Sequence, residues 1–152
     1  MPDWSLSSNL GPLGALPTAP SLARGFVSAV LEGWDMEALA DTTELIASEL
    51  TTNVVRAATG PDGNPAYDDD GGLPLLWLRL LADSEQLMIE VWDNLPAVLG
   101  APVVQHPEPD DESGRGLEMV DILSHDWGWE KVAGWDGKRV WALLTAREES
   151  AA

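Results

Sequence analysis

The stretch Glu49-Leu50-Thr51-Thr52-Asn53 lies inside the longest helical pattern of the chain and does most to decide the fold. Apolar residues recur around it every three or four positions, and the pattern stops at Gly60-Pro61. Glu49 and Asn53 are four residues apart, so their side chains share one face of the predicted helix. A carboxylate beside an amide carbonyl suits Mg²⁺ with waters, and the carboxylate could orient or deprotonate a hydroxyl. A spacing of four residues alone is more often that of an ordinary solvated helix face, and this interpretation of Glu49 and Asn53 stays open.

The segments around this helix predict an α+β fold. Helical spacing precedes it over residues 21–34, and a short helix is expected to begin near Gly116. Strand patterns over 75–81 and 86–92 flank Asp83-Ser84-Glu85, which is a hairpin signal. A second hairpin is expected over 127–132 and 139–144. This order predicts a two-layer α/β sandwich with helices on one face of a mixed sheet.

The predicted organisation is one domain with loose ends. Residues 1–20 are rich in Pro, Gly and Ser, which predicts a loosely ordered arm, with an edge strand at its end as the alternative. The domain itself is expected over 21–146, followed by a tail at 147–152. From residue 93 to 113 the chain is rich in Pro and acidic residues without periodicity, a pattern that indicates either an active-site lid or a wrong assignment of elements.

Composition excludes several classes of function. The 152 residues carry a formal net charge of −18, which repels a nucleic-acid backbone. Cys is absent and His106 and His125 are the only histidines, so a His/Cys metal site is not expected. Apolar stretches fall far short of the roughly 20 residues that cross a bilayer, and no secretory signal opens the chain. We therefore expect a cytoplasmic protein that binds neither nucleic acid nor membrane.

Two further clusters are candidates for ligand binding. Asp93 follows a strand pattern directly, and Ser113-Gly114-Arg115-Gly116-Leu117 leads into a helix. Glycines let the backbone approach a ligand closely, and the free N–H groups of a helix start suit phosphate oxygens. Taken singly, each cluster is more often ordinary turn chemistry.

In this order and at these separations, the three clusters resemble the nucleotide site of the gyrase, Hsp90, histidine kinase and MutL group. In particular, they look like its small actinobacterial branch related to anti-sigma-factor serine kinases. The stretch 49–53 matches the N-box, Asp93 the adenine-recognising Asp, and 113–117 the glycine box. The hairpin formed by 126–129 and 137–142 matches the closing strands. The resemblance covers residues 21–145 and identifies the predicted domain, 21–146, as a histidine kinase-like ATPase domain.

The resemblance implies a Bergerat-type sandwich in which ATP lies between helices and a lid. Asp93 would accept a hydrogen bond from the adenine amino group, Asn53 would hold Mg²⁺ through ATP, and Glu49 would act as the catalytic base. The phosphates would be surrounded by residues of the glycine box: Gly114, Arg115, Gly116 and Leu117.

The function implied by the resemblance is that of an anti-sigma-factor-type protein serine kinase. Such a protein transfers the γ-phosphoryl group of ATP to a Ser of an antagonist protein. Its partners would be a sigma factor, the antagonist or both, and a homodimer is compatible with the resemblance. The alternative is a non-catalytic module that keeps the fold and sequesters a partner with weak or no nucleotide binding. An ordinary α+β interaction protein without nucleotide is the third reading.

Two departures from the family pattern keep the alternative open. The family often continues from its Asp with glycines, whereas Asp93 is followed by Asn94-Leu95-Pro96. The final strand often offers a Thr near the adenine, and this chain reads Lys138-Arg139-Val140-Trp141 there. Both departures predict weakened or altered adenine binding.

Overall fold

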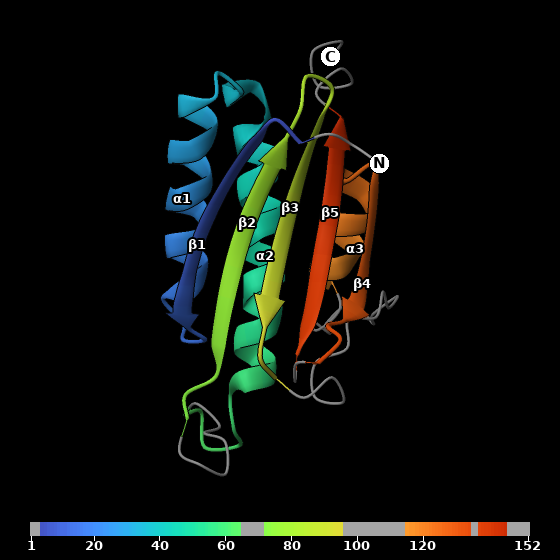
Figure 1. Ribbon diagram of the computed structural model, residues 1–152. Helices are drawn as coiled ribbons and strands as arrows, with labels where there is room; N and C mark the ends of the chain where they lie inside the picture. The colour runs from blue at the N-terminus through green and yellow to red at the C-terminus, as the bar shows by residue number, and fades with distance from the viewer. Residues whose placement is uncertain (1–3, 65–71, 96–114, 135–136, 146–152) are drawn as a thin grey trace.

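The computed structural model describes residues 4–64, 72–95, 115–134 and 137–145 as two packed layers. Figure 1 shows a five-stranded sheet in front of three helices, which all cover the same face. The predicted α+β sandwich with helices on one face is therefore confirmed. Within the described ranges, none of the helices combines the length and the apolar character that a membrane crossing requires.

The elements follow the predicted order with two additions, a strand at the N-terminal end and a short 3-10 helix between the first two helices. They are β1 (Leu6–Gly14), α1 (Ala19–Gly33), the 3-10 helix η1 (Glu37–Leu39), α2 (Ala40–Ala58), β2 (Leu75–Ala82), β3 (Gln86–Asp93), α3 (Arg115–Leu123), β4 (Asp126–Lys131) and β5 (Lys138–Thr145). The strands are arranged in the order β1-β2-β3-β5-β4.

Every strand pair in this sheet is antiparallel, which corrects the expectation of a mixed sheet. The strand that follows α3, β4, runs in the same direction as β3 (Figure 1). The hairpin partner β5 lies between these two strands and pairs with both. No parallel pair forms among the described strands because the hairpin folds back into this position.

Strand β1 corrects the expectation of a loosely ordered arm over residues 1–20. Leu6 and Leu10 pair with β2, and the register then shifts between Leu10 and Leu13. Gly11 lies at this irregularity with a φ of 129°, a backbone conformation that favours glycine. Proline is tolerated at the edge of a sheet, so Pro12 does not end the strand. Pro and Gly are typical of loops, so the composition indicated a loop. In the structure these residues form a bulge within a strand.

The hydrophobic core lies between the sheet and the helices. Alternate residues of each strand point to this side, as the period of two requires. The largest fully buried apolar side chains come from both layers: Val27, Leu31, Ile46, Leu76, Leu78, Leu80, Leu87, Ile89, Val91 and Val120. Each such side chain contributes about 1.5–3 kcal/mol when fully buried. This core fixes α2 and α3 against the sheet and thereby positions the predicted site residues.

The opposite face of the sheet carries charged and aromatic side chains. Arg79 and Trp141 both lie opposite Glu90 in the neighbouring strands. Glu90 is only 1% exposed and forms ion pairs with Arg79 and with Arg139. The guanidinium groups of both arginines also lie over the ring of Trp92, at 5.6 and 6.0 Å from its centroid. The buried carboxylate of Glu90 is therefore paired with two arginines, on a face of the sheet that none of the described helices covers.

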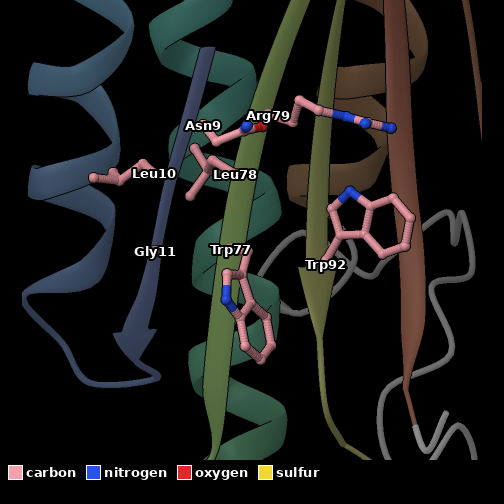
Figure 2. Close-up of a pocket in the computed structure, with 7 residues that line it drawn as sticks. All are labelled: Asn9, Leu10, Gly11, Trp77, Leu78, Arg79 and Trp92. Atoms are coloured by element: carbon pink, nitrogen blue, oxygen red, sulfur yellow. The ribbon is translucent and has the colours of Figure 1, made fainter. Parts of the chain in front are cut away.

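A hollow of about 220 Å³ opens on this face beside Trp77 and Trp92. Figure 2 shows the two indoles and the side chain of Arg79 along strands β2 and β3. Trp77 and Trp92 are cross-strand partners, so both belong to the same face. A Cβ on Gly11 would lie 2.8 Å from Cδ1 of Trp77. Glycine at this position therefore allows β1 to approach the indole.

We expect Gly128→Ala to lower the free energy of unfolding by about 1–2 kcal/mol, because it overpacks the same face. An added Cβ would lie 2.9 Å from Cζ2 of Trp141, which covers the glycine. Gly25→Ala is the matched control, since α1 leaves open space at that position. The control should raise stability by about 0.5–1 kcal/mol, because alanine is the better helix former. Urea unfolding measures both values, and equal effects would contradict the packing account.

Candidate functional site

Helix α2 carries the first two predicted site residues. The helix packs against α1, α3 and β3, and its buried threonines satisfy their hydroxyls locally. Thr43 and Thr51 donate to the carbonyl oxygens of Leu39 and Ala47, each at 2.7 Å. These two hydroxyl groups on the inner face of α2 therefore require no hydrogen-bond partners from the sheet.

Glu49 and Asn53 lie on α2, and both are partly buried. Neither side chain makes a hydrogen bond or an ion pair to any residue in the described part of the chain. The amide nitrogen of Asn53 is nevertheless buried. Buried polar atoms in native proteins have partners, so a buried amide without one indicates that a ligand or water belongs there.

Asp93 and Lys138 form a buried ion pair at the end of the sheet. They are cross-strand partners at the last residue of β3 and the first of β5. The ammonium of Lys138 donates to Oδ2 of Asp93 at 2.6 Å. The backbone N–H of Leu95 donates to Oδ1 at 3.0 Å. The Asp93 side chain is 0% exposed and that of Lys138 is 3% exposed.

The two charges act on each other across this contact. Burial raises the pKa of the Asp93 carboxyl above its ordinary value, and the Lys138 ammonium opposes that rise. Both oxygens of the carboxylate already have hydrogen-bond partners. The pair is thus a closed unit that leaves no exposed acceptor for a ligand.

The chain around Asp93 is fixed by further contacts. The side-chain oxygen of Asn94 accepts a hydrogen bond of 2.9 Å from the backbone N–H of Leu75. The N–H of Asn94 donates to the carbonyl of Leu75 at 3.3 Å. On the other side, a Cβ on Gly137 would lie 2.0 Å from the carbonyl oxygen of Asp93. Only glycine allows the start of β5 to pass this close to the end of β3.

The predicted glycine box lies at the start of α3. Arg115, Gly116 and Leu117 form the first turn of this helix, and Leu117 is buried in the core. Gly114 lies outside the described residues. Figure 1 places the start of α3 at the same end of the sheet as the last residue of β3. The fold thus brings this turn, Asp93 and Lys138 to one end of the domain.

The residues present fit the cation and phosphates of a bound Mg²⁺-nucleotide, which would lie at α2. They do not fit its base, which would lie at Asp93. At the α2 end, a carboxylate and a buried amide without a partner fit a cation and phosphate oxygens. At the other end, the acceptor proposed for adenine already binds an ammonium and a backbone N–H. The roles of Glu49, Asn53 and Asp93 stay predictions.

Lys138 is the residue whose role sequence reasoning missed. The sequence shows the run Lys138-Arg139-Val140-Trp141 where the family often offers a Thr, but it does not show that the Lys138 side chain reaches Asp93. The two residues are 45 positions apart, and only the register of β3 against β5 makes them partners. Gly137, directly before Lys138, was the available signal, since this glycine allows the close approach at which β5 begins.

A comparison with protein families matches residues 13–143 to the histidine kinase-like ATPase domain. The match runs from the end of β1 through most of β5, and so includes α2, Asp93 and α3. A search of curated proteins gave no match. The family match supports an ATP-binding, ATPase-like regulatory domain, for which Mg²⁺ is the typical cation. Because the match spans most of its length, the chain belongs to the histidine kinase-like ATPase domain family.

Proposed function

We propose that this chain is an anti-sigma-factor-type regulator that transfers a phosphoryl group to a serine of an antagonist protein. The observation that carries the proposal is the pair on α2, where Glu49 has no partner and the buried Asn53 amide nitrogen also has none, within the described residues. Rotation of the amide would present its oxygen, a ligand that hard cations prefer, at the same place. Family membership supplies the ATP-binding context.

In this proposal each residue of the pair has one task. Asn53 holds Mg²⁺ together with the phosphates, and Glu49 accepts the proton of the acceptor serine hydroxyl. Bound ATP would supply the phosphoryl group. The phosphoryl acceptor is a serine on the surface of the antagonist protein. It would approach α2 at Glu49, whose side chain is partly exposed.

The buried pair of Asp93 and Lys138 favours a second candidate function. A module that only sequesters its partner needs a complementary surface and no open adenine site. The Lys138 ammonium on Asp93 is compatible with that role, because it removes the acceptor through which the family would read adenine. Phosphoryl transfer separates the two candidates.

We expect Glu49→Gln to lower the rate of phosphoryl transfer by about 100-fold or more while partner binding is kept, because the amide preserves shape and removes the base. The measurement is transfer of labelled γ-phosphate to a co-purified antagonist protein at physiological salt. Glu44→Gln is the matched control, since it removes the same charge from another face of α2. Transfer at the parent rate in Glu49→Gln would rule out Glu49 as base. A parent protein that binds the partner tightly without transfer would favour sequestration.

We expect Asn53→Ala to weaken Mg²⁺-dependent ATP binding about tenfold or more with little loss of stability, because the side chain is a proposed ligand and not part of the core. Calorimetric titration with and without Mg²⁺ measures the effect. Equal affinity of parent and variant for Mg²⁺-ATP would show that Asn53 is not a ligand.

A further inference from the structure

The buried pair of Lys138 and Asp93 also bears on which nucleotide the domain accepts, provided that the proposed nucleotide site on α2 is correct. An adenine amino group donates a hydrogen bond, so it needs a free acceptor. The Asp93 carboxylate offers none at the surface, because it is 0% exposed and Lys138 and Leu95 bind its two oxygens. A base could reach this carboxylate only by opening the buried contact between Asp93 and Lys138.

Displacing Lys138 is a costly exchange. Its side chain is 3% exposed, so its ammonium would stay buried without a counter-charge. The penalty for an uncompensated buried charge exceeds the net gain from one hydrogen bond between adenine and a carboxylate. The ion pair therefore persists against adenine binding.

Turning Asp93 outward is opposed by the backbone on both sides. The N–H of Leu95 holds Oδ1, and two hydrogen bonds between Asn94 and Leu75 fix the next residue. Leu95 itself is buried, at 5% exposure. A rearrangement that freed the carboxylate would break these contacts together.

We infer that Lys138 determines nucleotide specificity by preventing Asp93 from recognising the base. This domain therefore binds ATP and GTP with similar affinity. Affinity then comes from the triphosphate and Mg²⁺ at Asn53 and the first turn of α3. The ammonium takes the hydrogen-bonding role that the adenine amino group has in the family pattern. Guanine and adenine differ in the group at this position, and neither gains a partner there.

The first test titrates the parent protein with Mg²⁺-ATP, Mg²⁺-GTP and inorganic triphosphate by calorimetry. The inference expects dissociation constants for ATP and GTP within about threefold, and competition by inorganic triphosphate. A preference for ATP of more than about tenfold would overturn it, since a charge-assisted hydrogen bond separates the two by at least that factor. If neither nucleotide binds, the proposed nucleotide function itself fails, and the inference fails with it.

A second test changes Lys138 itself. Lys138→Thr removes the cation and leaves Oδ2 of Asp93 without its donor, so the preference for ATP over GTP should rise to about tenfold or more. Lys138→Arg keeps a cation on the carboxylate and should keep the ratio near one. Lys131→Thr is the matched control, because Lys131 is exposed on the neighbouring strand opposite Lys138. An unchanged ratio in a folded Lys138→Thr would reject Lys138 as the determinant. If Lys138→Thr does not fold, the ratio of the ATP and GTP dissociation constants of the parent protein decides whether the inference holds.

Discussion

Lys138→Met is expected to lower the free energy of unfolding by about 3–5 kcal/mol at neutral pH, because it leaves the Asp93 carboxylate buried without its cation. Urea or thermal unfolding of parent and variant measures this value. Lys131→Met is the matched control, since its side chain is exposed on β4. It should change stability by less than about 0.5 kcal/mol. Equal losses in the two variants would contradict the buried ion pair.

The double variant Asp93→Leu with Lys138→Met separates the charge from the packing. Replacing both partners of a buried pair by apolar groups is often neutral or stabilising. The double variant loses the hydrogen bond from Leu95 to the carboxylate as well, which is worth about 1.5–3 kcal/mol. We therefore expect it to recover part of the stability that the single variant loses. A double variant as unstable as Lys138→Met would show that Lys138 matters by shape alone.

The loss in Lys138→Met should also depend on pH. Burial raises the pKa of Asp93, and the variant lacks the ammonium that opposes this rise. A carboxyl whose folded pKa lies above its unfolded value contributes stability that is full below the unfolded pKa. That stability is lost as pH rises through the folded pKa. The difference between parent and variant should therefore be smaller near pH 5 than near pH 8, as unfolding at both pH values would measure.

Glu90→Gln is expected to lower the free energy of unfolding by about 3 kcal/mol. One carboxylate accepts from the Nε atoms of Arg79 and Arg139, and each hydrogen bond to a charged group is worth about 1.5–3 kcal/mol. The amide keeps one acceptor and turns a donor toward the other arginine. Because the Arg79 side chain is 40% exposed, it relaxes into water and limits the loss.

Glu130→Gln is the matched control for Glu90→Gln. Glu130 also pairs with Arg139, at 3.0 Å, but its side chain is 62% exposed. Exposed pairs contribute at most about 1 kcal/mol, so the control should unfold close to the parent. Chemical unfolding of both variants compares a buried carboxylate with an exposed one on the same arginine. Losses of the same size would contradict the assigned role of Glu90.

Local patterns in the sequence were sufficient to predict most elements. The helix around Glu49 and the two hairpins have clear periodicity and turn residues, so their bounds differ from the structure by only a few residues. The sequence also placed Glu49 and Asn53 on one helix face, because four residues make about one turn. Strand β1 was predicted only as an alternative to a loose arm, since Gly11 and Pro12 indicate a loop unless an adjacent strand is known.

The ion pair of Asp93 and Lys138 could not be predicted from local patterns. Its two residues meet only because β5 folds back between β3 and β4 and starts opposite Asp93. That register depends on the close approach at Gly137, which is a tertiary contact. The sequence identified Asp93 as a candidate ligand, whereas the fold determines whether its carboxylate is free.

The irregularity of β1 has a consequence for the behaviour of this protein in concentrated solution. An edge strand offers unpaired N–H and C=O groups to which another chain can add a strand, which is a route to aggregation. Pro12 lacks an N–H group, and the shift between Leu10 and Leu13 bends the strand out of regular pairing geometry. The outer edge of β1 is therefore a poor template for a neighbouring molecule. The formal charge of −18 acts in the same direction at the β1 edge, because molecules of like charge repel one another.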